Sequence, residues 1–169
     1  TINKLALTDP DLEFLLPFAS AKVRETFFEA VGESASLPQV RFLDGQARTA
    51  LAASDAALLA SGTAALEAAL LGCPMVVAYR VSAASFWLAR MLATTRYVSM
   101  PNHLMPTPLV PEFLQDQADQ SNLSGAIARL LNAPDHRNEM LQGLSGIRDS
   151  LQRDANYNIA RLLGELAFG

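Results

Sequence analysis

The stretch "ASGTAALEAALLGCP", Ala60 to Pro74, decides how the middle of the chain folds. An apolar run of strand length, "DAALLA" over 55–60, leads into it, and a run rich in β-branched residues, "MVVAYR" over 75–80, follows it. The pattern predicts a strand, a tight turn, a short helix and a second strand. A ligand of such a unit lies at the turn. The Ser-Gly-Thr sequence there, and the glutamate four residues after the threonine, therefore need a chemical explanation.

The same alternation extends toward the start of the chain. We expect strands over 12–18, 39–45 and 55–60 and another that begins at Pro74, with helices over 21–32, 46–54 and 63–72 between them. Ser20 is the expected cap of the first of these helices, and Gly32 and Gly72 are expected helix stops. Strands that alternate with helices through short loops predict an α/β fold, a Rossmann-like parallel sheet with helices on both faces.

The second half of the chain no longer alternates strand and helix patterns. Residues 82–96 have a helical pattern with Phe86 and Trp87 on a broad apolar surface, either packed over the sheet or exposed to a membrane. The proline-rich segment 97–115 predicts an ordered loop that leads to a small helix. Residues 121–168 are helical throughout, with three successive apolar faces. We therefore divide the chain into a Rossmann-like domain, 1–120, and C-terminal helices, 121–169, that pack on it or on a partner domain.

Composition narrows the class of protein. The chain has 169 residues, 50% hydrophobic and 18% charged, which is enough apolar sequence for one folded domain. A net charge of −4 argues against nucleic-acid binding, and the single Cys73 and two separated histidines predict neither disulfides nor a metal site. No apolar run is long enough to span a membrane, so we expect a cytoplasmic protein. Because the sequence starts at Thr1 within a helical pattern, we expect part of a longer chain.

Ser61, Gly62 and Thr63 follow a strand, at the sheet edge where parallel α/β folds bind ligands. Thr63 begins a helix whose first N–H groups and dipole form an anion site, and Gly62 lets the backbone approach a phosphate. Glu67, one turn further on, can accept hydrogen bonds from a ribose diol. The pattern predicts a nucleoside diphosphate site. The alternative is a capping sequence followed by a solvated glutamate, but Glu67 is the only charge in its helix.

The stretch "SDAALLASGTAALEAALLGCPMVVAYRVSAASFWLARMLATTRYVSMPN", together with "LVPEFLQ", closely resembles the lipid-A-disaccharide synthases, a family of GT-B glycosyltransferases. The resemblance covers nearly the whole chain and implies the C-terminal, nucleotide-sugar-binding half of such an enzyme. It implies that Glu67 holds the ribose hydroxyls and that Ser61–Thr63 lies against the diphosphate. It places the uracil, less specifically, against Leu43–Gly45.

The family's second marker is Pro-Asn followed at a distance by Pro-Glu and a glutamine. Asn102, Glu112 and Gln115 match it, and the resemblance implies that they contact the sugar and its phosphates. The alternative is structural, with Asn102 forming a turn and Glu112 an acid in the first turn of a helix. Between these residues "HLMPTP" lacks a basic residue that is common in the family, so a phosphate contact there is not expected.

The reaction implied is transfer of 2,3-diacylglucosamine from UDP-2,3-diacylglucosamine to 2,3-diacylglucosamine 1-phosphate (lipid X), with inversion and release of UDP, in lipid A biosynthesis. The resemblance implies no metal or cofactor, a peripheral location on the cytoplasmic face of the inner membrane, and allows a homodimer. The family's first strand with its Pro-Gly-Ser-Arg turn is missing from the sequence. So is the acceptor-binding half with its general base, so the catalytic residues stay unknown and we expect the chain alone to be inactive.

Two other readings stay open at this point. One is another GT-B-type UDP-sugar transferase or an epimerase of the same architecture. The other is a non-catalytic module for folding or dimerisation that binds no nucleotide.

Overall fold

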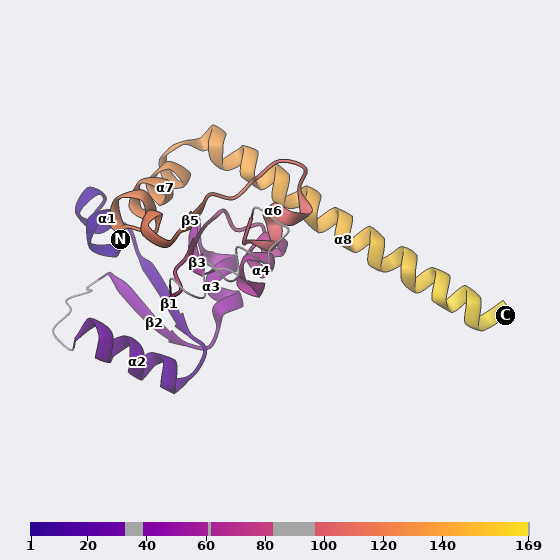
Figure 1. The fold of residues 1–169 in the computed structure, drawn as a ribbon, viewed down its shortest axis with the longest axis horizontal. Coiled ribbons are helices and arrows are strands. Elements are labelled where there is room, and N and C mark those ends of the chain that lie inside the picture. Colours follow the sequence, from indigo (N-terminus) through magenta and orange to yellow (C-terminus); the bar gives the residue numbers. More distant parts are fainter. Residues whose placement is uncertain (33–38, 61, 83–96, 169) are drawn as a thin grey trace.

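The fold is taken from a computed structural model that describes residues 1–32, 39–60, 62–82 and 97–168, with the backbone alone described for 154–168. It has an α/β architecture in which every strand pair is parallel, as the sequence predicts. The strands form two separate sheets, β1-β2 and β3-β4-β5 (Figure 1). Of the helix expected over 82–96, residues 83–96 lie outside the described residues.

The first sheet pairs β1 (Phe14–Phe18) with β2 (Val40–Asp44). Helix α1 (Ile2–Thr8) precedes it, and α2 (Ala21–Val31) connects its strands. The predicted cap of α2 is confirmed, because the Ser20 side chain accepts a hydrogen bond from the Val23 N–H. An aromatic cluster lies between α2 and the two strands, with neighbouring ring centroids 5.1–6.2 Å apart; its members are Phe18, Phe27, Phe28 and Phe42.

The second sheet has the order β3 (Ala57–Ala60), β4 (Met75–Tyr79), β5 (Glu112–Leu114). Helix α3 (Ala47–Ala53) precedes β3, and α4 (Thr63–Leu71) connects β3 to β4 and ends at Gly72 in the left-handed conformation, as predicted. The first three residues of β4 are all 0% exposed although their side chains alternate between the two faces. Both faces of the central strand are therefore covered, and α4 and α7 both contact it.

The second half of the chain corrects one expectation and refines another. The proline-rich segment contains a short helix, α6 (Met100–Leu104), and a strand, β5, where the sequence indicated an ordered loop leading to a small helix. A 3-10 turn (Gln115–Gln117) follows β5. The last residues form two helices, α7 (Gln120–Asn132) and α8 (Pro134–Phe168), and the second and third of the three expected apolar faces both belong to α8. Figure 1 shows α8 as one continuous helix whose far end extends away from the sheets.

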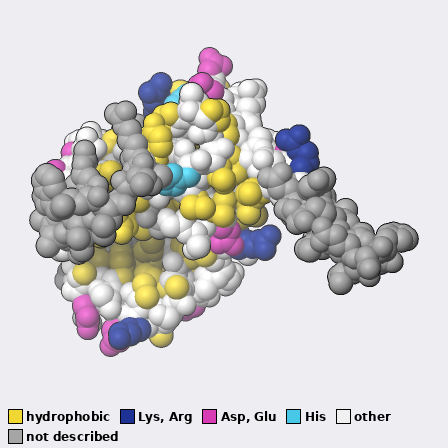
Figure 2. Space-filling model, turned by 45° about the vertical axis from the view of Figure 1, so that its right-hand side comes forward, with side chains coloured by type: hydrophobic (Ala, Val, Ile, Leu, Met, Phe, Trp, Pro, Cys, Tyr) yellow, Lys and Arg dark blue, Asp and Glu magenta, His cyan; other side chains and the backbone are white. Residues whose placement is uncertain are grey.

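The core lies between the second sheet and the helices α4, α7 and α8. Met75, Leu130 and Leu144, from a strand and two helices, are each 0% exposed. Some large apolar side chains remain exposed, among them Leu58, Leu70, Met100 and Leu104. Figure 2 shows hydrophobic side chains gathered on one face of the molecule, with charged side chains scattered around them. Apolar surface of this kind indicates contact with further polypeptide or ligand.

Candidate functional site

The turn between β3 and α4 has a backbone that only glycine adopts readily. Gly62, the N-cap of α4, has φ 111° and ψ −148°, and a Cβ there would meet no atom within 4 Å. Among the described residues no side chain caps α4, so the N–H groups of Thr63 and Ala64 face the space beyond Gly62, whereas Ala65 donates to the Gly62 carbonyl at 3.2 Å. These groups and the helix dipole favour an anion at this position. Ser61, which we expected to contact the same anion, lies outside the described residues.

Thr63 and Glu67 share the face of α4 that points away from the core. The opposite face is formed by Ala65, Ala68 and Ala69, which are at most 1% exposed. Because successive helix residues are about 100° apart, Thr63 and Glu67 fall together on the other side, one turn from each other. Glu67 is half-buried, and among the described residues its carboxylate has no hydrogen-bond or ion-pair partner. A half-buried carboxylate without a partner is suited to receive a ligand's hydroxyl groups.

Glu112 is the centre of a second polar group. Its Oε2 accepts the Val98 N–H at 2.8 Å, and its Oε1 accepts the Ser99 N–H at 3.0 Å and the Ser99 hydroxyl at 2.6 Å. The Asn102 side-chain amide donates to the same Oε1 at 2.7 Å. Glu112 begins a strand, so the alternative that made it a first-turn acid of a helix is wrong. Its carboxylate instead fixes the segment that enters α6.

Asn102 is buried, 2% exposed, and all of its hydrogen-bonding capacity is used within the loop. Its Oδ1 accepts the N–H groups of Leu109 and Val110, both at 2.8 Å, and its Nδ2 also donates to the Val110 carbonyl at 2.8 Å. The side chain therefore closes the proline-rich loop on itself. A direct contact between Asn102 and the sugar stays a prediction.

Gln115 pairs with the backbone after β4. Its Oε1 accepts the Val81 N–H at 2.8 Å, and its Nε2 donates to the Val81 carbonyl at 2.9 Å. Gln115 has φ 51°, an uncommon conformation for a residue other than glycine. The side chain thus replaces one step of β-pairing and ties together the ends of β4 and β5. Contact between Gln115 and the substrate also stays a prediction.

Parallel strands bring the loops that follow them to one edge of the sheet. Gly62, after β3, and Gln115, after β5, both lie at this carboxyl edge. Glu112 instead pairs with Val77 in the middle of β4 and lies further from the edge. The helices that carry Glu67 and Asn102, α4 and α6, contact each other. The structure therefore brings the predicted residues onto neighbouring elements. Among the described residues the Thr63 and Glu67 side chains have no hydrogen-bond partner, whereas those of Asn102, Glu112 and Gln115 are bonded within the protein.

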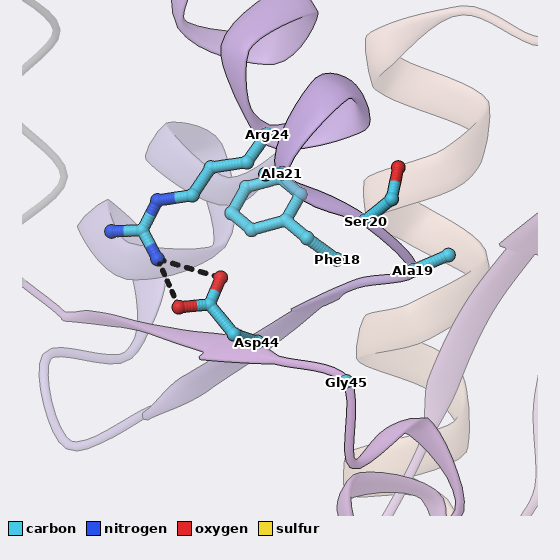
Figure 3. A pocket seen from close by; sticks show the side chains of 7 residues that line it. All are labelled: Phe18, Ala19, Ser20, Ala21, Arg24, Asp44 and Gly45. Carbon is cyan, nitrogen blue, oxygen red and sulfur yellow. Dashed lines mark hydrogen bonds and ion pairs between the residues drawn. The ribbon is translucent and has the colours of Figure 1, made fainter.

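An open pocket of about 510 Å³ lies where β1 and β2 end (Figure 3). The Arg24 guanidinium has three partners there. Its Nη1 contacts both carboxylate oxygens of Asp44, at 2.8 and 2.9 Å, and its Cζ is 5.8 Å from the ring centroids of Phe18 and Phe28. The residues that line the pocket come from the last position of each strand, the loops after both strands and the start of α2; they are Phe18, Ala19, Ser20, Ala21, Arg24, Asp44 and Gly45.

Sequence reasoning found only part of this pocket. The resemblance pointed to Leu43–Gly45, of which Asp44 and Gly45 line it, whereas Arg24 was read as one more position of a helix. The Asp-Gly pair after an expected strand was a usable signal for the turn. The partner of Asp44 is 20 residues earlier in the chain, and only the parallel pairing of β1 with β2 brings the two together.

Cys73 is buried, and its environment makes it unreactive. Burial, and secondarily the negative charge of Asp55, raises the pKa of Cys73 to about 11 from its ordinary value of 9.0. The thiol therefore stays protonated at neutral pH and is a poor nucleophile. Within the described ranges, no three His, Cys, Asp or Glu side chains are grouped as metal ligands would be.

The parallel α/β fold, with helices on both faces and a glycine turn at the carboxyl edge, is that of a Rossmann-like glycosyltransferase domain. A family model described as "Lipid-A-disaccharide synthetase" matches residues 1–163. The lipid-A-disaccharide synthases of Klebsiella pneumoniae (strain 342) and Shigella dysenteriae serotype 1 are 44% and 42% identical to the chain over 167 residues, 99% of its length. An Escherichia coli (strain SMS-3-5 / SECEC) enzyme of the same name is also 42% identical. The chain belongs to the lipid-A-disaccharide synthase family.

The matched region covers 44% of each of these relatives, so the chain spans less than half of their length.

The family consists of glycosyltransferases of lipid A biosynthesis, in agreement with the resemblance stated from the sequence. In the part of the chain that the structure describes, no helix is both long enough and apolar enough to cross a membrane.

Proposed function

We propose that this chain forms the donor-nucleotide wall of a lipid-A-disaccharide synthase and binds the UDP part of UDP-2,3-diacylglucosamine. The observation that carries the proposal is the carboxylate of Glu67, which lies one turn inside α4, is half-buried and has no partner among the described residues. Leaving such a group unpaired is unfavourable, and two ribose hydroxyls are partners that it can accept. The alternative, a solvated surface glutamate without a functional role, does not explain why Glu67 is the only charged residue of α4.

The diphosphate lies against Ser61–Thr63. The open first turn of α4 supplies N–H donors, and the conformation of Gly62 allows phosphate oxygens to approach them. The same donors stabilise the negative charge that develops on UDP as it departs, because they are oriented before the reaction begins. Family membership supports this placement and favours it over a site for an unrelated anion.

The uracil base occupies the pocket at the ends of β1 and β2. Its volume, about 510 Å³, is in the usual range for small-molecule sites, and it opens at the carboxyl edges of these strands. The Arg24–Asp44 pair fixes the loop after β2. The Gly45 N–H donates to the Phe18 carbonyl at 2.8 Å and so holds the ends of the two strands together beside the base. This assignment deepens the expectation that the resemblance attached to Leu43–Gly45.

Asn102, Glu112 and Gln115 form the floor and side of the sugar site. Their side chains hold the segments around α6 and the end of β4, and contact with the sugar or its phosphates is made by the surfaces that they organise or by the side chains themselves. If these side chains act only by holding the loop, replacing Asn102 should lower the stability of the protein. If Asn102 contacts the ligand directly, the replacement should instead weaken ligand binding without a loss of stability.

In the complete enzyme, the acceptor's sugar hydroxyl attacks the anomeric carbon of the donor sugar. The bond between that carbon and the UDP oxygen breaks with inversion, and a general base outside this chain takes the hydroxyl proton. The products are the β-1,6-linked disaccharide and UDP. The acceptor is 2,3-diacylglucosamine 1-phosphate (lipid X), and the acceptor-binding half of the enzyme is the chain's partner across the active-site cleft.

The acylated substrates support a peripheral location on the cytoplasmic face of the inner membrane. A homodimer is also part of the proposal, as is the division into a nucleotide-binding domain, 1–120, and C-terminal helices, 121–169. Segment 82–96 is the part of the chain that we propose to touch either the membrane or the core.

Calorimetric titration of UDP, with UMP for comparison, into the parent chain and its Glu67→Ala variant tests the proposal. We expect weaker binding by the variant, and weaker binding of UMP because it presents one phosphate fewer to α4. Equal UDP binding by both proteins contradicts it and favours the non-catalytic module. A donor affinity that does not depend on the acyl chains favours another UDP-sugar enzyme. If the chain alone binds no UDP, the same substitution is compared in the complete enzyme.

A further inference from the structure

A cationic side chain at the carboxyl edge of the second sheet has no partner. Arg80 directly follows β4, the central strand, and is exposed. Among the described residues its guanidinium has no hydrogen-bond, ion-pair or aromatic partner. By contrast Arg24, at the carboxyl edge of the first sheet, is paired with Asp44. An unpaired cation at the edge where parallel sheets bind ligands is suited to an anionic ligand.

The strand register places Arg80 beside the turn that precedes α4. Ala60 of β3 pairs with Ala78 of β4, and this is the last pair between the two strands. Gly62 and Arg80 each stand two residues beyond it. Because neighbouring strands are about 4.8 Å apart, an arginine side chain on one strand can reach a ligand at the end of the next. The open N–H groups at the start of α4 and the Arg80 guanidinium can therefore approach one anion from two sides.

The backbone on both sides of Arg80 is held by β5 and the residue that follows it. Tyr79, directly before Arg80, pairs with Leu114 in the ladder. After Arg80, the side chain of Gln115 accepts the Val81 N–H at 2.8 Å and donates to the Val81 carbonyl at 2.9 Å. The Val81 N–H belongs to the planar peptide unit that begins at the Arg80 carbonyl. Gln115 therefore fixes the backbone from which the Arg80 side chain projects.

Gln115 makes this contact from an unfavourable backbone conformation. Its φ of 51° is uncommon for a residue with a side chain, and strain of this kind is concentrated at functional sites. We propose that Arg80 binds the diphosphate of the donor, and that Gln115 is the residue that positions Arg80 rather than a residue that contacts the sugar. This inference rests on the proposed function, because it requires a diphosphate beside Gly62.

The β-phosphate, which carries the sugar, is the group that Arg80 binds. Along the strand order β3-β4-β5, the carboxyl edge carries Gly62, Arg80 and Gln115 in turn. The α-phosphate is joined to the ribose at Glu67 and stays next to α4, whereas the β-phosphate lies further along the edge. The end of α4 supplies only about half of a positive charge, and segment 103–108 contains no lysine or arginine. The Arg80 guanidinium supplies a full charge, which stabilises UDP as its bond to the sugar breaks.

Calorimetric titration of UDP and UMP into the parent chain, Arg80→Ala and Arg129→Ala tests the contact. Arg129, an exposed arginine in the last turn of α7, is the matched control. We expect Arg80→Ala to weaken UDP binding roughly 10- to 100-fold, the usual loss for a hydrogen-bonded charge, and to weaken UMP binding much less. Arg129→Ala should change neither affinity. UDP binding to Arg80→Ala as tight as to the parent overturns the contact.

The Glu67→Ala variant, titrated in the same series, separates this inference from the proposed function. UDP binding that is weakened by Glu67→Ala but not by Arg80→Ala overturns the role of Arg80 alone. UDP binding that is unchanged in both variants overturns the nucleotide site as well. If the 169-residue chain binds no UDP, the same substitutions are compared in the complete enzyme, with the same outcomes.

A double-mutant cycle with Gln115→Ala tests the positioning role. If Gln115 acts through Arg80, its loss weakens UDP binding in the parent but has little further effect in Arg80→Ala. An equal loss in both backgrounds means that Gln115 contacts the substrate independently, and it overturns the positioning role. Unchanged UDP binding to Gln115→Ala overturns it too. If Gln115→Ala does not fold, Gln115→Asn takes its place in the cycle, because its side chain is one methylene too short for the same two hydrogen bonds.

Discussion

Nδ2 of Asn102 donates to Oε1 of Glu112 across 2.7 Å and so joins helix α6 to the first residue of β5. The same amide also donates to the Val110 carbonyl, and the carboxylate accepts three further hydrogen bonds from Val98 and Ser99. Polar groups buried in such a network depend on one another, because removing one leaves its partners unpaired. The family's Pro-Asn and Pro-Glu markers therefore meet in one structural unit.

Replacing Asn102 with alanine should lower the free energy of unfolding by about 2–4 kcal/mol, because the buried N–H groups of Leu109 and Val110 lose their acceptor. Urea unfolding measures the change. His103→Ala, at the exposed neighbouring position, is the control and should change stability by less than about 0.5 kcal/mol. An Asn102→Ala protein of unchanged stability that has lost UDP-sugar binding would instead show that Asn102 contacts the ligand directly.

The Gly62→Ala substitution should destabilise the chain by about 1–3 kcal/mol through backbone strain alone. No atom lies within 4 Å of the added Cβ, so a steric clash contributes nothing. Gly146→Ala is the matched control, since Gly146 also has open space around it but lies within α8 without a positive φ. That variant should be more stable than the parent by about 0.5–1 kcal/mol. Equal effects in urea unfolding would mean that Gly62 does not need its unusual conformation.

Arg24→Ala should reduce UDP affinity with little effect on folding. The Arg24–Asp44 pair is solvent-exposed, so the loss of this pair should lower the free energy of unfolding by less than about 1 kcal/mol. The substitution also removes the Arg24 side chain from the lining of the base pocket, which should weaken UDP binding. Arg41→Ala breaks a similar exposed pair, with Glu13, that lines no described pocket. We expect calorimetry to find weaker UDP binding for Arg24→Ala alone. If both variants bind UDP like the parent, the base lies elsewhere.

The buried thiol of Cys73 should make stability fall with rising pH in the alkaline range. Unfolding returns its pKa from about 11 to about 9.0, so between these values the unfolded chain releases a proton that the folded chain retains. This contribution is fully present below pH 9 and is lost by at most about 1.4 kcal/mol per pH unit up to 11. Urea unfolding at pH 8–11 should show a flatter profile for Cys73→Ala. Parallel profiles for the two proteins would exclude a raised thiol pKa.

Local patterns predicted most of the first half of the fold. The alternation of apolar runs with Ser20, Gly32 and Gly72 placed α2 and α4 and their strands within a few residues, because caps and stops act through neighbouring backbone groups. Two of the three expected apolar faces lie within residues 134–168. No proline interrupts this segment, and its backbone continues as α8.

The remaining features depend on contacts between distant parts of the chain. β5 has three residues and follows a proline, so it carries no strand pattern of its own and exists because Val77 and its neighbours pair with it. Gly143 looks like an ordinary helix position, yet a Cβ there would lie 2.6 Å from Leu109 on the proline-rich loop. For the candidate site, the sequence pointed to Glu67 and the glycine turn, whose contacts with a ligand stay predictions, but it indicated neither Arg24 nor the internal bonding of Asn102 and Gln115.

The central claim is that Glu67 holds the ribose of UDP, and calorimetric titration of UDP into the parent, Glu67→Ala and Glu139→Ala tests it most directly. Glu139 is an exposed glutamate of α8 and serves as the matched control. We predict that Glu67→Ala weakens binding by about 1–3 kcal/mol, roughly 5- to 150-fold in Kd, and that Glu139→Ala leaves it unchanged. UDP binding to Glu67→Ala as tight as to the parent would contradict the account.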